Sequence, residues 1–152
     1  MDYQPKDRYG DEVEQEIAAL SGELLDVLQA KGEVTKPGPM AGPCRVSAAD
    51  AEMYRSVRHP WSFYGVDNKV LESAMDNLAK GLPDRGWKIV KNGPDASKNR
   101  NPEILAVHLK SRTQAEITWR KGLQGREPLI SFAVYSRCFR DPDRSTRPAG
   151  ED

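Results

Sequence analysis

The segment RHPWSFYG, residues 58–65, gathers the side chains of this chain that are best suited to acid–base chemistry. His59 could act as a general base with the hydroxyl of Ser62 or Tyr64 as its partner, as in a small hydrolase. Neighbouring side chains of an extended segment point to opposite faces, which works against that convergence. The alternative is that the histidine and the aromatic rings pack at a sheet edge. The candidate binding residues of this segment are Arg58, His59, Trp61 and Tyr64.

A second candidate is the stretch NGPDASKNRNP, residues 92–102, which consists of turn and loop residues. Lys91, Lys98 and Arg100 would place three cations around this loop, where backbone N–H groups can also hold an anion. The alternative is a solvated connection between two strands.

Charge is unevenly distributed, although the net charge of the 152 residues is zero. Residues 1–33 carry nine acids and three bases, whereas residues 85–126 carry ten bases and three acids, a local balance of +7. This asymmetry allows an anionic partner for the basic half, and two solvated faces are the alternative. The basic strands carry Trp87 and Trp119, but no RNA-binding stacking motif is present, so no specific nucleic acid is expected.

Several classes of site lack support in the sequence. The two cysteines are 94 positions apart and His59 and His108 are the only histidines, so closely spaced zinc ligands are missing and no metal is expected. The motifs of nucleotide-binding P-loops, zinc proteases, serine hydrolases and EF-hands are absent, and no cofactor is expected. No run of 18 apolar residues and no signal-peptide pattern occurs.

Two amphipathic helices are predicted to support these sites. The first spans residues 11–32, with acidic residues in its first turns and Gly32 as its stop. The second follows Asp67 as its N-cap and ends at Gly81. Their apolar stripes are Val13, Ile17, Leu20, Leu24, Val27 and Leu28 in the first, and Val70, Leu71, Ala74, Met75 and Leu78 in the second.

Between and after the helices, extended segments are predicted. Residues 33–44 form a Pro/Gly linker, and Pro60 marks the segment that ends at Tyr64 as an edge or bulged strand. Before it, residues 47–54 could form a helical turn. A short strand follows over residues 86–91, and three more carry alternating apolar residues. Their predicted core residues are Leu105, Val107 and Leu109, with His108 on the polar face, then Ala115, Ile117 and Trp119, then Ile130, Phe132, Val134 and Cys138.

Short loops between these strands favour an antiparallel meander. The fold class expected is therefore α+β, an antiparallel sheet of four to five strands with two helices packed on one face. One domain is expected over residues 11–140, preceded by a flexible lead-in over residues 1–10 and followed by a disordered tail over residues 141–152.

Several short motifs resemble those of a family of small proteins. Residues 44–140 contain Leu82-Pro83 followed by Gly86-Trp87, then GPDAS at residues 93–97, and a final strand that closes on Cys138. This array is similar to small secreted or membrane-anchored proteins, often described as lipoproteins, of streptomycetes and related actinobacteria. The resemblance carries no activity and no catalytic residues. It implies a location outside the cytoplasmic membrane, although no lipobox cysteine precedes the domain, so the mode of anchoring stays open.

The oxidising compartment that this resemblance implies favours a disulfide between Cys44 and Cys138. The number of cysteines is even, and none is left over. The alternative is two buried reduced thiols in a cytosolic protein.

The function expected from these features is an extracytoplasmic, non-enzymatic binding or scaffold domain at the cell envelope. Its partner would be an anionic envelope component or a protein, its acidic first helix would be a stalk near the membrane, and a monomer is expected. The alternatives are a small hydrolase built around His59 and a cytoplasmic interaction module of the immunity-protein kind.

Overall fold

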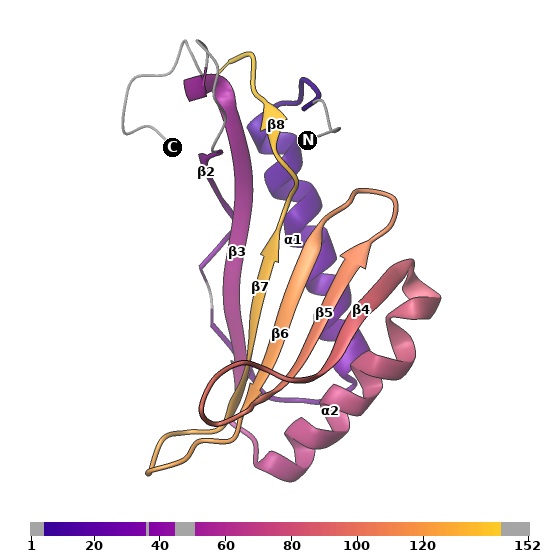
Figure 1. Cartoon of the computed structure of the whole chain (residues 1–152), viewed down its shortest axis with the longest axis vertical. Coiled ribbons are helices and arrows are strands. Elements are labelled where there is room, and N and C mark those ends of the chain that lie inside the picture. Colours follow the sequence, from indigo (N-terminus) through magenta and orange to yellow (C-terminus); the bar gives the residue numbers. More distant parts are fainter. Residues whose placement is uncertain (1–4, 36, 45–50, 144–152) are drawn as a thin grey trace.

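The computed structural model describes residues 5–35, 37–44 and 51–143 (Figure 1). It contains two helices on one face of an eight-stranded antiparallel sheet, which confirms the predicted α+β class. Six strands follow one another in the order β1-β3-β7-β6-β5-β4, and β2 and β8 pair with β3 as well. The elements are α1 (Gly10–Leu28), β1 (Glu33–Val34), β2 (Met40–Pro43), β3 (Tyr54–Tyr64), α2 (Asn68–Gly81), β4 (Trp87–Pro94), β5 (Pro102–His108), β6 (Gln114–Arg120), β7 (Leu129–Tyr135) and β8 (Phe139–Arg140), with short 3-10 helices at Ala51–Met53 and Pro83–Arg85.

Helix α1 packs along β3 and against α2, so it belongs to the core and is not a stalk. Its whole predicted stripe is at most 5% exposed. The helix ends at Leu28, earlier than predicted, because Gln29 adopts a left-handed conformation with φ 50° and donates its N–H to Asp26 O. Gly32 serves a different purpose: a Cβ there would lie 2.7 Å from the Phe63 ring, so only glycine allows this close approach.

Helix α2 begins as the sequence predicted. The Asp67 side chain accepts a hydrogen bond from the N–H of Val70 at 3.1 Å, which satisfies one free donor of the first turn. Leu71, Ala74 and Leu78 are fully buried, and the helix is followed by Pro83 in a 3-10 turn.

The Pro/Gly segment predicted as a linker contributes two short strands. β2 pairs with residues 55–58 of β3 and β1 pairs with residues 63–64, so residues 59–62 have no partner strand from the described chain on this side. Ser62 donates its N–H to Thr35 Oγ1 and accepts from the N–H of Thr35 on this side. The backbone nitrogen of Pro60, two residues away, faces the same side and has no hydrogen to donate. Because none of the described strands pairs with Pro60 on that side, no hydrogen bond of the sheet is lost there.

The predicted inward face of β5 is wrong. Ile104 and Ala106 are buried at 1% and 2% exposure, while Leu105 and Val107 are half-buried on the face opposite the helices. Both alternating sets of this strand are apolar, so the strand's own pattern is ambiguous. The register decides, because it places Ala106 beside Ile89 and Ala115, and Ile104 beside Ile117. Leu109 is 49% exposed.

The Cys44–Cys138 disulfide is confirmed, with a Cα–Cα distance of 6.1 Å. The predicted inward position of Cys138 is wrong, because β7 ends at Tyr135 and breaks the alternation. Cys138 is half-buried, and Phe139 at 2% exposure takes the core position.

The two ends of the described chain meet at one end of the sheet. Arg8 donates its N–H to Arg140 O, and Arg140 donates its own to Lys6 O, each at 2.9 Å. Asp141, only 2% exposed, accepts from the N–H of Gly10 at 3.0 Å and so caps α1. Parts of the expected lead-in and tail therefore hold the fold together, and the remaining expected tail, residues 144–152, lies outside the described residues, as do residues 47–50 of the possible helical turn.

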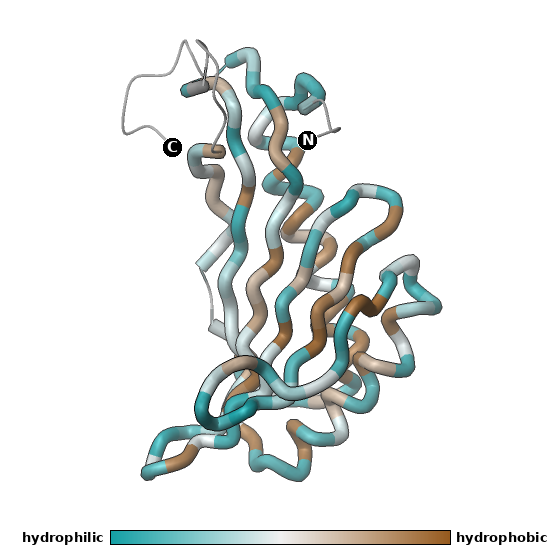
Figure 2. The backbone as a smooth tube through the Cα atoms, in the orientation of Figure 1, coloured by the Kyte–Doolittle hydropathy of each residue, from teal (hydrophilic) through white to brown (hydrophobic). Residues whose placement is uncertain are grey.

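Hydropathy follows this architecture. Figure 2 shows hydrophobic stretches along the strands and α1, and hydrophilic loops at the lower end of the sheet. Within the described ranges, no helix is both long and apolar enough to cross a membrane.

Candidate anion-binding cleft

A cleft of about 420 Å³ is lined by the first half of α1, the β5–β6 turn and the β7–β8 connection. Its floor is apolar and consists of Val13, Leu20 and Phe139. Its remaining lining is polar, and half of it is basic: Lys6, Arg8, Lys110 and Arg137, together with Glu16, His108, Ser111 and Ser136.

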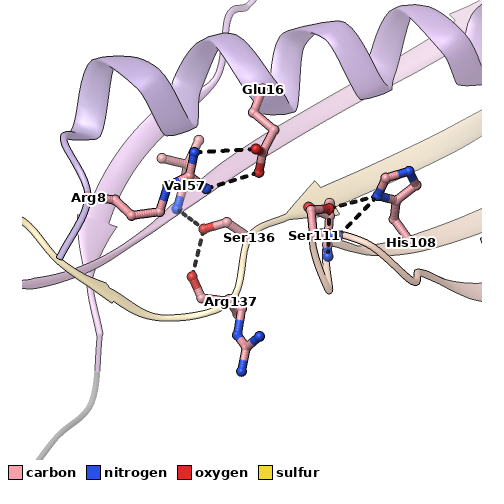
Figure 3. A network of polar contacts seen from close by, with 8 residues as sticks. Arg8, Glu16, Val57, His108, Ser111, Ser136 and Arg137 are labelled. Atoms are coloured by element: carbon pink, nitrogen blue, oxygen red, sulfur yellow. Dashed lines mark hydrogen bonds and ion pairs between the residues drawn. The ribbon is translucent and has the colours of Figure 1, made fainter. Parts of the chain in front are cut away.

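Arg8 and Glu16 form a two-pronged ion pair inside this cleft (Figure 3). Arg8 Nη1 donates to Glu16 Oε1 at 3.2 Å, and Nη2 donates to Oε2 at 3.3 Å. This fork is the geometry in which arginine recognises carboxylates and phosphates. The two side chains are 37% and 32% exposed, so water reaches the pair.

The β5–β6 turn forms one wall and carries Lys110. His108 Nδ1 is hydrogen-bonded to Ser111 Oγ at 2.8 Å, and Ser111 Oγ to Thr113 Oγ1 at the same distance. Arg112, in a left-handed conformation with φ 61°, donates its N–H to His108 O. No carboxylate in the described part of the chain hydrogen-bonds to His108. The Ser–His pair thus holds the turn, while the orienting acid of a hydrolase is missing.

The opposite wall is the β7–β8 connection. Ser136 Oγ accepts from the N–H of Val57 and donates to Arg137 O, each at 2.9 Å, which ties the connection to β3 (Figure 3). Cys138 lies two residues after Ser136, so the disulfide to Cys44 holds the same connection at a second point. The guanidinium of Arg137 points away from the Arg8–Glu16 pair in this view.

His59 does not face the cleft. Its Nε2 lies 2.7 Å from Pro37 O, which can only accept, so Nε2 donates; in the neutral ring Nδ1 then accepts from Ser21 Oγ, 2.8 Å away. Trp61 Nε1 donates to the same hydroxyl at 3.2 Å. Ser21 is 5% exposed. The structure does not join His59 to Ser62 or Tyr64, and its actual partner is a buried serine of α1.

Trp61 belongs to the core. It is 4% exposed and stacks on Phe132 with ring centroids 3.9 Å apart. Arg58 and Tyr64 lie on the other face of the sheet, where Tyr64 pairs with Glu33 of β1. Arg58 lies 5.3 Å from the ring centroid of Tyr135. The four candidates of this segment are therefore divided between two faces of the sheet.

Tyr135 is the described tyrosine with a clearly altered acidity. Its hydroxyl donates to Glu116 Oε1 at 2.9 Å. Burial, with the hydrogen bond and the charge of Glu116, raises the pKa of Tyr135 to about 12, against a smaller opposing effect of Arg58.

The predicted basic loop is shorter than expected, because β4 runs to Pro94, and its centre is a carboxylate. Asp95 Oδ1 accepts from the N–H and the hydroxyl of Ser97 and from the N–H of Asn101. These bonds, with the Ser97 hydroxyl first, lower the pKa of Asp95. Lys91 is paired with Glu103 at 3.1 Å, while Lys98 and Arg100 are exposed. Backbone donors that an anion would need are thus already used by Asp95.

Sequence reasoning missed the cleft because its cations come from segments that are far apart in the chain. Lys6 and Arg8 precede the first helix, Lys110 lies in a turn, and Arg137 follows β7. No motif links them. The described residues bring together no group of three or more His, Cys, Asp or Glu side chains that could hold a metal ion. No family model, curated protein or solved structure matches this chain.

Proposed function

We propose that this chain is an extracytoplasmic, non-enzymatic domain that binds an anionic component of the cell envelope in the cleft. The observation that carries this proposal is the lining, which combines four basic residues and one carboxylate with the apolar residues Val13, Leu20 and Phe139. The Cys44–Cys138 disulfide supports the extracytoplasmic location, because disulfides persist in oxidising compartments. The resemblance to actinobacterial lipoproteins agrees with this location and stays a prediction.

Two lysines of the cleft have charge available for a ligand. Among residues 5–35, 37–44 and 51–143, Lys6 and Lys110 form no ion pair with a carboxylate. Clustered charge of one sign in a concave surface concentrates ions of the opposite sign and speeds their association. An anion between these lysines would therefore gain from both.

The contacts of His59 favour binding over hydrolysis. Both of its ring nitrogens have partners, and the serine beside it is buried between α1 and β3. A substrate carbonyl cannot reach that hydroxyl without opening the core.

Inorganic pyrophosphate, titrated into ¹⁵N-labelled protein and followed by NMR, tests the proposal. We expect amide shifts to concentrate at the cleft, and the K6Q/K110Q variant to bind roughly tenfold more weakly because two cations are lost. The matched control is K88Q/K98Q, which removes two exposed lysines elsewhere and should lose about twofold or less at physiological salt. Equal losses in both variants, or shifts spread over the whole surface, would contradict a site in the cleft.

A further inference from the structure

We infer that Arg8 is the anion seat of the cleft and that the carboxylate of Glu16 occupies this seat in the free protein. The ligand group is an oxyanion with two adjacent acceptor oxygens, a carboxylate or a phosphate, which takes the place of Glu16. This inference rests on the proposed function, because it assumes that the cleft binds anions at all.

The position of Arg8 does not depend on Glu16. Its backbone N–H is held by Arg140 O, and Asp141 caps the helix that starts two residues later. The backbone of Arg8 therefore stays at the cleft when its fork is released, and this keeps the guanidinium within reach of a ligand there. Arginine in this place is suited to a two-oxygen anion, since its planar guanidinium presents two parallel N–H donors at the required spacing.

Glu16, in contrast, can leave its position easily. It lies on the surface of α1 between the buried Val13 and Ile17, which hold that turn of the helix through apolar contacts. The side chain has several rotatable bonds, and a partly exposed ion pair contributes little to stability. Released from Arg8, the carboxylate can turn into water without disturbing the helix.

The surroundings favour an external anion over Glu16. Lys6 and Lys110 line the same cleft and have no carboxylate partner in the described chain. A ligand bound to Arg8 would also be attracted by these two lysines, whereas the Glu16 carboxylate forms an ion pair with Arg8 and, within the described residues, with neither lysine. Glu16 also repels an incoming anion, so its removal should strengthen binding rather than weaken it.

The test compares Glu16→Gln with Glu12→Gln, because Glu12 lies one turn earlier on α1, is exposed, and loses the same charge. Inorganic phosphate and acetate are titrated separately into each protein and followed by NMR. We expect Glu16→Gln to bind at least one of them roughly three- to tenfold more tightly than the unaltered chain, and Glu12→Gln to gain about twofold or less. Adding Arg8→Gln to Glu16→Gln should abolish the gain.

The outcomes separate the inference from the proposed function. A gain for phosphate alone or for acetate alone supports the seat and names the ligand group. Equal affinity of the Glu16→Gln and Glu12→Gln variants, while K6Q/K110Q still weakens pyrophosphate binding, overturns the seat and leaves the function. Absence of binding in every variant overturns both. Glu16→Ala is the second variant, with the same expected gain, and thermal unfolding checks that each protein is folded.

Discussion

Two Ser–His pairs with the same 2.8 Å contact differ in almost everything else. Ser21 and His59 join α1 to β3 inside the packed layer, where Trp61 shares the serine and Pro37 O takes the other ring nitrogen. His108 and Ser111 lie in the β5–β6 turn at the cleft. The contact distance alone therefore says nothing about chemistry. What separates the two regions is access to the serine, since Ser21 is 5% exposed in the core whereas Ser111 is half-buried and borders the cleft.

The largest expected effect comes from the disulfide, which holds a wall of the cleft but not the Ser21–His59 pair. The C44A/C138A variant should lose about 4 to 5 kcal/mol of unfolding free energy in the chain-entropy estimate for a loop of this length. Urea unfolding measures it, and reduction of the unaltered protein should reproduce the loss. Unchanged stability in both experiments would contradict the expectation.

The Ser21–His59 pair should matter more for stability than the His108–Ser111 pair at the cleft. Ser21→Ala leaves Trp61 Nε1 without its partner in the core and His59 Nδ1 without its partner at a half-buried position, at a cost of about 1 to 3 kcal/mol. Ser111→Ala, in a half-buried turn, is the matched control and should cost less than about 1 kcal/mol. Denaturant midpoints of the two variants give the comparison. Equal losses would remove the distinction between the two regions.

The smallest effect is expected at Tyr135, on the sheet face opposite the helices, where the side chain is half-buried. Because the pKa of Tyr135 is raised from 10.0 to about 12, its neutral form is favoured by the fold. The associated stability is fully present below pH 10 and is lost as the pH rises towards 12. Partial exposure should keep the loss below about 1 kcal/mol.

Absorbance at 295 nm against pH, for the unaltered protein and Tyr135→Phe, checks this. The variant should lack the last tyrosine to ionise, and its stability should depend less on pH between 10 and 12. A component near pH 12 that survives in Tyr135→Phe would contradict the assignment to Tyr135.

The sequence predicted the structure best where its pattern was compatible with one arrangement only. Apolar residues lie on one side only in α1 and in β6, and Asp67 marks the start of α2, so the fold class and both helices could be predicted directly. β5 failed because Leu105 and Val107 compete with Ile104 and Ala106, and only pairing with neighbouring strands resolves such a strand.

The cleft and the strands of the Pro/Gly segment depend on contacts between distant residues. β2, with the sequence MAGP, has little intrinsic tendency to form a strand and exists through its pairing with β3 and the adjacent disulfide. The cleft needs residues 6–8 beside the β7–β8 connection, a contact that no local pattern encodes. The pairing of the disulfide was predictable, since a chain with two cysteines permits one intramolecular pairing, whereas its oxidised state was expected from the compartment that the resemblance implies.

The hydrogen bond between Gly10 and Asp141 spans 131 positions. A chain that emerges from a ribosome or a translocation channel with its N-terminus first makes α1 long before it makes the residue that caps it. Until nearly the whole domain has emerged, the first helix lacks its cap, and β7 and β8 are not yet present. Completion of this domain is therefore expected only after residue 141 has emerged, because its first helix depends on contacts of such long range.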